Sequence, residues 1–561
     1  MGTVTFAAYF RARIDALSRF TLLLSTPVAL LCSLLIALPV VSIFFVALQP
    51  NAESLAILRH LASTVLADYV LTSVLLCVLV GTGVACVGAL AACAVSLFEF
   101  KGRAAFEWLL LLPLAMPAYV VAFAYTDFLQ FSGPAQTALR AAFGWQGRVF
   151  PEIRNVGGAA FVLTVTLYPY VYLLVRAALT ERATHLMEAA RMLGAPLARR
   201  ISAVALPLAR PALAAGVALA LMETLADFGV TSYFGIQSFT VGIYKAWLAM
   251  DNVVAAAALA ALLLLTVAAL LWAERRAERR MRFTSTRGGA QRGDAGRAEA
   301  RPIVLTGRRA LAAQLVCLLP ALCGFFLPVL MMLRPLLQSF DGTAMSRWAD
   351  FLRWSGNSLA LAAVASMFAT FVALMLAYAA RRQGTALTRL GVNVVALGYA
   401  VPGAVVVVGL LLPVAALQAA WPQLGVAALV TTTAIGIMWA YLVRFSAVAL
   451  QSVQSGYARI PKSFDDSARM LGATDGRLFR AVHAPLLARS TAVAALLVFV
   501  DVMKELPATL VLRPFNSDTL AVITYQLAKD ERLGEAALPA LALVAVGLLP
   551  VMVLSRALRA R

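Results

Sequence analysis

Four acidic residues in apolar stretches are the strongest candidates for chemistry in this sequence. Glu223 and Asp227 stand four residues apart in one such stretch, and Asp501 and Glu505 stand four apart in another. A carboxylate at membrane depth costs about 2.5 kcal/mol or more, so it usually faces a protein interior or a solute path. Carboxylates that lie close together require protons, a counter-ion or a cation, and their hard oxygen atoms suit a hard cation. The two pairs therefore predict a path for a cationic solute.

Neighbouring side chains could contribute to such a path or only stabilise the helices. Lys504 directly precedes Glu505 and could neutralise it, so ion pairs that hold helices together remain an alternative. Tyr168 and Tyr170 could offer phenol oxygens to a passing cation, although such aromatic residues more often pack or lie at the membrane interface. The three histidines and six cysteines show no ligand spacing. We expect no stably bound metal, no bound cofactor and no catalytic centre in this chain.

Each acidic pair follows a copy of the same polar motif. Residues 188–194 read EAARMLG and residues 466–472 read DSARMLG, so the copies are 278 residues apart (469 − 191). The same separation maps Pro207 onto Pro485 and the first acidic pair onto the second. Such a register is the mark of an internal repeat, which fused transporter halves leave in a sequence.

The motif predicts a short helix that ends at a glycine and is followed by a second helix. One face of the first helix is apolar because apolar residues recur at i, i+4 and i+7: Leu186, Ala190 and Leu193 in one copy, Phe464, Ala468 and Leu471 in the other. Gly194 and Gly472 suit the left-handed backbone that ends a helix, and Pro196 suits the start of the next. A hairpin with an apolar ridge and arginine flanks indicates a surface that a partner grips.

The composition places these elements in a lipid bilayer. The 561 residues are 62% hydrophobic and 13% charged, with a mean hydropathy of +0.86. A soluble domain has no use for so much apolar surface. The net charge of +20 lies mostly in short arginine clusters between apolar stretches, which suits inside-positive topology and does not favour nucleic-acid binding.

We therefore predict an all-α integral membrane protein with about 12 transmembrane helices in two pseudo-symmetric six-helix halves. The expected divisions are a cytoplasmic N-terminal segment at 1–19, a first half at 20–273 with its loop near 181–207, an Arg-rich cytoplasmic linker at 274–309, a second half at 310–555 with its loop near 459–485, and a cytoplasmic tail at 556–561. Pro117 and Pro402 occupy matching third spans, where they predict kinks or else serve simple helix packing.

The loop pattern resembles the EAA loop of binding-protein-dependent ABC importer permeases. Glu188 to Pro207 meet that pattern, whereas the second copy has Asp466 and Ser467 in place of Glu and Ala. The resemblance implies a type I permease fold, two copies of a separate ATP-binding subunit that hold ATP and Mg, an extracytoplasmic solute-binding protein, and the bacterial inner membrane. The residues expected to dock the ATPase are Glu188, Ala189, Ala190, Gly194, Pro207, Asp466, Ser467, Ala468, Gly472 and Pro485.

The solute is a separate question. The segments METLADFGVTSYFG at 222–235 and DVMKELPATLVLRPF at 501–515 resemble the ferric-iron branch of these permeases, which is commonly one fused chain. Thiamine permeases are the nearest fused alternative, and thiamine is also a cation. An ion-driven secondary transporter would have similar halves and acidic residues. A channel or scaffold subunit would need neither docking loop.

Overall fold

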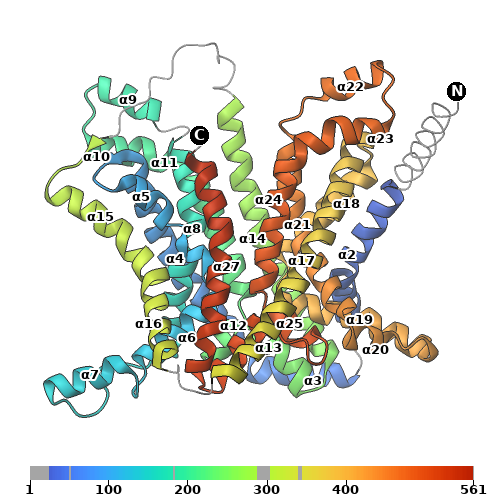
Figure 1. Cartoon of the computed structure of the whole chain (residues 1–561), viewed down its shortest axis with the longest axis horizontal. Helices are drawn as coiled ribbons and strands as arrows, with labels where there is room; N and C mark the ends of the chain where they lie inside the picture. The colour runs from blue at the N-terminus through green and yellow to red at the C-terminus, as the bar shows by residue number, and fades with distance from the viewer. Residues whose placement is uncertain (1–24, 50–51, 181–183, 287–302, 339–343, 560–561) are drawn as a thin grey trace. The chain divides into compact units, whose positions relative to one another are not determined.

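Helices make up nearly all of the described chain. The computed structural model describes residues 25–49, 52–180, 184–286, 303–338 and 344–559 (Figure 1). Within these ranges eleven helices are long and apolar enough to cross a membrane, and the count reaches twelve if one bent pair forms a single span. The expectation of an all-α protein with about twelve spans is confirmed.

Two compact units divide the helices, and neither unit coincides with a half of the sequence. Unit 1 contains residues 1–48 and 354–519, and unit 2 contains residues 49–353 and 520–561. The first spanning helix of each half is therefore part of the unit that holds most of the other half.

Unit 2 is organised around long helices that contact one another along their length: α4 (Leu66–Leu97), α8 (Val156–Ala178), α11 (Leu206–Ala226) and α14 (Val253–Thr286). Three helices from the second half of the sequence pack against this group or its neighbours: α15 (Arg308–Ala321), α16 (Leu327–Gln338) and α27 (Leu533–Arg559). The Tyr125 hydroxyl donates to the carbonyl of Cys323 at 2.8 Å, which fixes the join between α15 and α16 against the first half.

Shorter elements outside residues 184–205 also belong to unit 2. They are α3 (Ala52–Thr64), α5 (Arg103–Leu109), η1 (Leu112–Ala115), α6 (Ala118–Leu129), α7 (Pro134–Phe143), α12 (Gly229–Tyr233), α13 (Phe239–Tyr244), η4 (Lys245–Ala249), η6 (Leu322–Phe326) and α26 (Leu520–Lys529). Two short parallel strands, β1 (Phe98–Glu99) and β2 (Ile303–Val304), join the end of α4 to the segment before α15.

Unit 1 combines the first spanning helix with the middle of the second half. Its elements are α2 (Ser25–Ala47), most of α17 (Ala344–Gln383), α18 (Ala386–Leu397), η7 (Gly398–Ala400), α19 (Gly403–Ala420), η8 (Pro422–Leu424), α20 (Val426–Thr432), α21 (Ala434–Tyr457), α24 (Ala484–Lys504) and α25 (Pro507–Leu512). Helix α2 crosses α19 at Gly409, where an added Cβ atom would stand 2.2 Å from the carbonyl oxygen of Pro39. Only glycine permits this close approach.

The third spans of both halves are interrupted at proline, as the kinks predicted at these residues require. Pro117 has an extended backbone directly before α6, and the helices on its two sides are bent by 89°. Pro402 has the same role before α19. A proline cannot donate a backbone hydrogen bond, so a helix readily restarts at this residue.

The apolar stretches near 208–232 and 490–513 are each long enough to cross a membrane, but neither is one continuous helix, because α11 ends at Ala226 and α24 ends at Lys504. Asp227 and Glu505 follow with an extended backbone, and each directs its carboxylate to the backbone of the next short helix. Hydropathy does not reveal such a break because the chain stays apolar on both sides of it.

Part of the expected linker at 274–309 has regular secondary structure. Helix α14 continues through residue 286, and β2 and the start of α15 occupy its last residues. The remainder of the linker, the N-terminal segment 1–19 and the last two residues of the tail lie outside the described residues.

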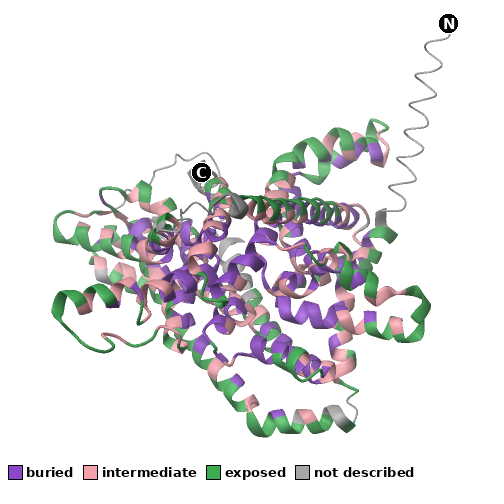
Figure 2. Cartoon of the chain, turned by 60° about the horizontal axis from the view of Figure 1, so that its bottom comes forward, coloured by how far each residue is buried: buried purple, intermediate pink, exposed green. Residues whose placement is uncertain are grey.

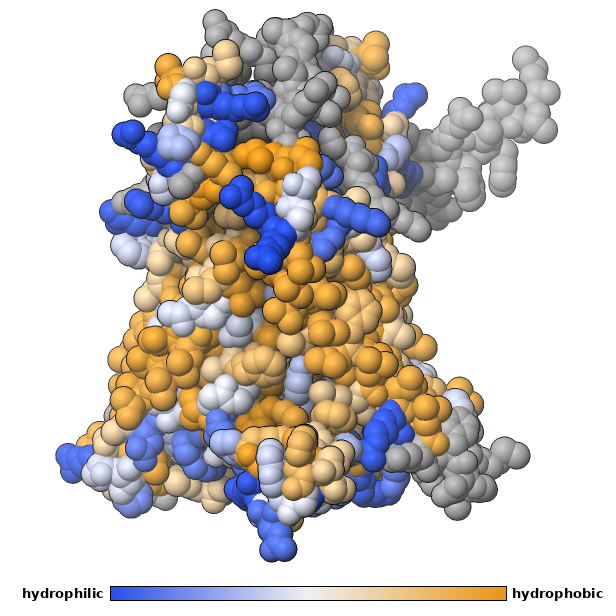
Figure 3. Space-filling view, turned by 90° about the vertical axis from the view of Figure 1, so that its left-hand side faces the viewer, coloured by the Kyte–Doolittle hydropathy of each residue, from blue (hydrophilic) through white to orange (hydrophobic). Residues whose placement is uncertain are grey.

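Burial and hydropathy agree with a membrane setting. Buried residues lie where helices face one another within each unit, and exposed residues lie on the outward faces (Figure 2). On the face that carries α15 and α16, an apolar belt runs between two zones of hydrophilic side chains (Figure 3). Many leucines on these outward faces are exposed, which is stable only against lipid or another protein.

Candidate functional site

The first motif forms the expected helix, glycine and helix. Helix α9 (Thr184–Met192) ends before Gly194, whose φ is +77°, and α10 (Leu197–Arg200) follows. The Gly194 amide donates to the carbonyl of Arg191 at 2.9 Å, and the Ala195 amide donates to that of Ala190 at 3.0 Å. This pair of bonds is the Schellman ending of a helix. A π-helical turn, η3 (Ile201–Ala205), then leads into α11. We call residues 184–205 hairpin 1.

The second motif repeats this geometry closely. Helix α22 (Lys462–Met470) ends before Gly472, whose φ is +78°, and α23 (Asp475–Leu478) and the π-helical turn η9 (Phe479–His483) lead into α24. The Gly472 and Ala473 amides donate to the carbonyls of Arg469 and Ala468, both at 2.9 Å. We call residues 462–483 hairpin 2.

Both hairpins present apolar side chains to the outside. In the expected ridge, Leu193 and Leu471 are each at least 86% exposed, and Leu186 and Phe464 are about half exposed. Met192 and Met470, which lie outside the expected ridge, are equally exposed and extend the apolar surface. The expected docking residues lie beside them: Glu188, Ala189, Gly194, Asp466, Ser467 and Gly472 are exposed, whereas Ala190 and Ala468 are half-buried. Pro207 and Pro485 stand in the first turns of α11 and α24, where proline was expected to mark the next span. So much exposed apolar surface beside charged residues fits a protein partner.

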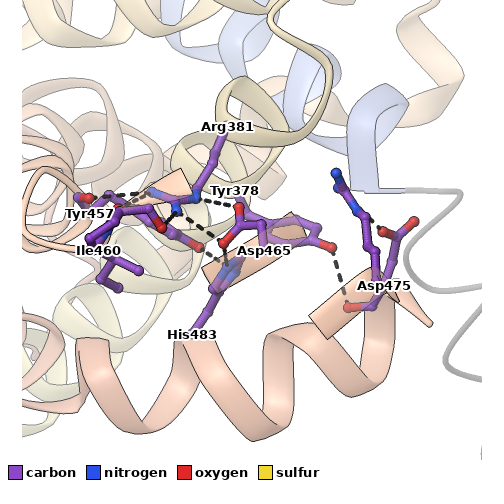
Figure 4. Close-up of polar contacts among 9 residues, drawn as sticks. Tyr378, Arg381, Tyr457, Ile460, Asp465, Asp475 and His483 are labelled. Atoms are coloured by element: carbon purple, nitrogen blue, oxygen red, sulfur yellow. Dashed lines mark hydrogen bonds and ion pairs between the residues drawn. The ribbon is translucent and has the colours of Figure 1, made fainter. Parts of the chain in front are cut away.

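Hairpin 2 is fixed to unit 1 by a buried ionic cluster (Figure 4). The Arg381 guanidinium at the end of α17 donates to both carboxylate oxygens of Asp465, Nε to Oδ2 at 2.8 Å and Nη2 to Oδ1 at 3.0 Å. The ring nitrogen Nε2 of His483 lies 3.0 Å from the same Oδ1. Asp465 is 8% exposed and His483 is 1% exposed. We call Arg381, Asp465 and His483 the clasp.

Sequence reasoning missed the clasp. The signal available was an aspartate immediately before the matched motif and a histidine two residues before Pro485, but their pairing depends on the end of α17, which is 84 residues away from Asp465. Burial alone would raise the pKa of Asp465, but the hydrogen bonds and charges of Arg381 and His483 lower it to about 2.

At the helix breaks, the carboxylates of the predicted path residues Asp227 and Glu505 accept hydrogen bonds from the backbone of the next short helix. Asp227 Oδ2 accepts from the backbone amides of Val230 and Thr231, both at 3.1 Å. Glu505 accepts from the amides of Ala508 and Thr509, both at 2.9 Å. These bonds satisfy the first free amides of α12 and α25, as helix caps do.

Glu505 also has a cationic partner, which is not the one suggested by its neighbour in sequence. Arg444 on α21 lies 3.3 Å from Glu505 Oε1, and the Thr509 hydroxyl donates to Oε2 at 2.6 Å. Lys504, which the sequence suggested as the neutralising group, interacts electrostatically with Asp501. Glu505 is 4% exposed, and its carboxylate serves as a helix cap and as the partner of Arg444.

The other predicted path residues differ in their exposure. Glu223 on α11 and Asp501 on α24 are partly exposed, whereas Tyr168 is buried and Tyr170 is half-buried. The Tyr168 hydroxyl finds no hydrogen-bond partner among the described residues. No group of three or more His, Cys, Asp or Glu side chains within the described ranges is placed to hold a metal ion. The convergence of both acidic pairs on one path stays a prediction.

Comparisons with known proteins agree with this architecture. Residues 85–283 and 369–561 each match the model of the binding-protein-dependent transport system inner membrane component family. Each match covers one hairpin, its flanking spans and the following broken span. The chain therefore belongs to this family. It is the permease component of an ABC importer and an integral protein of the inner membrane.

Individual relatives differ in how much of the chain they match. The Fe(3+)-transport system permease protein FbpB 2 of Haemophilus influenzae is 25% identical over 500 residues, which are 88% of this chain and 90% of the relative. The sulfate transport system permease protein CysT of Salmonella typhimurium is 29% identical over 26% of this chain and 50% of its own length. The molybdenum transport system permease protein ModB of Escherichia coli is 31% identical over 24% and 57%.

Proposed function

We propose that this chain forms the transmembrane path for ferric iron that an extracytoplasmic binding protein delivers. The observation that carries the proposal is the match to a ferric-iron permease over 88% of the chain, because the sulfate and molybdenum relatives match only about a quarter of it. The partly exposed carboxylates of Glu223 and Asp501 support a cation and disfavour an oxyanion.

We further propose that each hairpin seats in one copy of an ATP-binding subunit, which holds ATP and Mg and hydrolyses ATP. The exposed ridges support this role, because each is an apolar patch that lipid cannot cover if the hairpin projects into water. Positive flanking charge favours a cytoplasmic location for both hairpins and both termini. The binding protein would then deliver iron at the opposite side of the membrane.

The helix breaks suggest how movement at a hairpin reaches the path. Hairpin 1 continues into α11 and hairpin 2 continues into α24, and each of these helices ends at a capped break. A helix moves as a rigid rod, while a break between two helices permits a change of angle. ATP-driven movement of the hairpins would therefore tilt α11 and α24 relative to α12 and α25.

The substrate is tested by uptake into liposomes that contain the full chain with its ATP-binding subunit and binding protein. We expect radioactive ferric iron to accumulate only when ATP is present on the side of the membrane that holds the ATP-binding subunits. An excess of thiamine, sulfate or molybdate should not reduce this uptake. Uptake of thiamine or an oxyanion without uptake of iron would overturn the iron assignment. Iron uptake that follows a proton gradient and persists with an inactive ATPase would instead indicate a secondary transporter.

The acidic path is tested with Glu223→Gln, which keeps the size of the side chain and removes its charge. We expect iron uptake to fall about tenfold or more, because one charge contact to a cation is commonly worth at least 1.4 kcal/mol at membrane depth. The matched control is Glu152→Gln, because Glu152 is an exposed acid that pairs with Arg148 outside the spans. Equal uptake by Glu223→Gln and the unaltered protein would remove Glu223 from the path.

A further inference from the structure

The clasp joins three elements of unit 1 at one point. Arg381 uses its whole guanidinium: besides Asp465, it donates to the carbonyl oxygens of Tyr457, Ile460 and Pro461 at 3.0 to 3.3 Å. These carbonyls lie at the end of α21 and in the turn before α22, where a helix leaves acceptors unsatisfied. The end of α17 is thus bonded to α21 and to hairpin 2 together (Figure 4).

His483 extends the clasp to the following span. It lies on η9, which continues directly into α24, and its Nε2 lies 3.0 Å from Asp465. The rings of Tyr378, Tyr457 and Phe479 meet the imidazole edge to face, with centroids 5.4 to 6.3 Å away. Close aromatic packing leaves the imidazole little freedom to turn. The start of α22 and the start of α24 are therefore held by one carboxylate.

A second set of bonds holds the far end of the hairpin. Arg382 Nη2 lies 2.8 Å from Asp475 Oδ2, and the Tyr378 hydroxyl donates to the backbone carbonyl of Asp475 at 3.3 Å. Asp475 begins α23, so both arms of hairpin 2 are bonded to the same end of α17. A two-point attachment prevents the hairpin from pivoting about its glycine.

Hairpin 1 is built from different side chains at the matching positions. With the 278-residue register, Asp465 corresponds to Met187 and His483 corresponds to Ala205, and both of these residues are buried. Neither side chain has a group that can form an ion pair. The same register maps Arg381 onto Arg103 at the start of α5, and this arginine pairs with Glu99 on β1 and with Glu107. The clasp is therefore chemically impossible at hairpin 1.

We propose that Arg381, Asp465 and His483 are positioning residues that make hairpin 2 one rigid body with α17, α21 and the start of α24, while hairpin 1 has buried apolar residues at the two matching positions. This inference rests on the proposed docking role of the hairpins. Its consequence is that the two ATP-binding subunits drive the path unequally. Movement at hairpin 2 passes directly to α24, and part of the movement at hairpin 1 is absorbed by rearrangement of its apolar base.

The first test measures hairpin mobility in the permease alone, so it does not depend on partners or on the substrate. A version without native cysteines carries one spin label at Met192→Cys or at Met470→Cys, two positions that are almost equally exposed. We expect Asp465→Met, which installs the residue found in hairpin 1, to increase motion at position 470 and to leave position 192 unchanged. The control Asp350→Asn breaks an exposed Arg353–Asp350 pair on the same helix α17 and should change neither label.

Two outcomes of this test would overturn the proposal. Unchanged motion at position 470 would show that the clasp does not hold the hairpin, and increased motion at both positions would show general loosening. Arg381→Lys provides a second variant if Asp465→Met does not fold. It keeps the charge but not the planar fork, so it should mobilise position 470 to a smaller extent than Asp465→Met.

The second test measures solute moved per ATP hydrolysed in the reconstituted transporter. We expect Asp465→Met to lower this ratio at least threefold while ATP hydrolysis continues, and Asp465→Glu to restore part of it. Met187→Ala, which loosens the apolar base of hairpin 1, should lower the ratio less. Equal losses at both hairpins would refute unequal drive. If the unaltered protein moves a solute other than iron, the ferric assignment fails and this comparison still applies to that solute.

Discussion

At the scale of single residues, the acidic groups divide into structural and accessible ones. Glu505 is buried, bonded to two backbone amides and paired with Arg444, whereas Asp501, one turn earlier, is partly exposed. Two acidic residues four positions apart thus have different surroundings. Their removal should therefore have different consequences.

We predict that Glu505→Ala destabilises the protein and that Asp501→Asn does not. Loss of Glu505 leaves the Arg444 charge and the amides at the start of α25 unpaired, and breaking a buried ion pair costs about 3–5 kcal/mol. The measurement is the thermal unfolding midpoint of the purified permease, with uptake measured in parallel. Similar unfolding midpoints for Glu505→Ala and the unaltered protein would contradict the capping role.

The clasp predicts a definite dependence of stability on pH. Because the pKa of Asp465 is lowered from 3.8 to about 2 in the folded protein, its ionised form stabilises the fold above pH 4 by about 2 kcal/mol. This contribution is lost as the pH falls from about 4 towards 2, since the carboxylate then takes up a proton in both states. The unfolding midpoints of Asp465→Asn and the unaltered protein should therefore approach each other as the pH falls from about 4 towards 2. A difference that stayed the same down to pH 2 would contradict this assignment.

At the scale of elements, the hairpins depend on one backbone conformation each. Gly194 and Gly472 have φ near +77°, and an added Cβ atom would meet nothing within 4 Å at either position. Within the permease itself, any effect of a substitution there must therefore come from the backbone and not from a steric clash. A side chain that tolerates a positive φ should therefore be accepted at these positions, and a β-branched side chain should not.

We predict that Gly472→Val and Gly194→Val weaken the hairpins and that the matched asparagine variants do not. A β-branched residue in the left-handed region costs about 1–2 kcal/mol or more, whereas asparagine tolerates that region. Co-purification with the ATP-binding subunit and ATP-dependent uptake should fall in the valine variants and persist in the asparagine variants. Equal behaviour of valine and asparagine at one site would show that its backbone conformation is not required.

At the scale of the whole molecule, the two units exchange their first spanning helices. Helix α2 packs on α18 and α19 in unit 1, although it begins the first half of the sequence. Helices α15 and α16 begin the second half and pack in unit 2, against α4 and α6. Each half of the sequence therefore contains apolar helices whose partners lie on the other half.

We predict that neither half is stable when it is produced alone. A chain cut after residue 290 should yield fragments that accumulate to a several-fold lower level singly than together, because α2 or α15 and α16 would lack their partners. Co-produced fragments should purify as one complex, as should full-length protein cut in the same segment after folding. A first fragment that accumulates alone at the level of the intact chain would contradict the exchange.

The sequence by itself determined the helical class, the number of spans, both hairpins and the glycines that end their first helices. These features depend on apolar periodicity and on the backbone preferences of glycine and proline, which act between near neighbours. It also located the acidic pairs and the kinks at Pro117 and Pro402. All of these features depend on residues that are close together in the sequence.

Only the tertiary structure decided which distant residues meet. Arg381 is 84 residues from Asp465 and Arg444 is 61 residues from Glu505, so these pairs form only after whole helices have packed. The breaks at Asp227 and Glu505 have the same origin, because a carboxylate caps a helix only where the packed chain turns there. The exchange of first helices follows from the fit between helix surfaces, which local periodicity does not encode. The repeat thus made the hairpins look nearly equal, and packing made their attachments different.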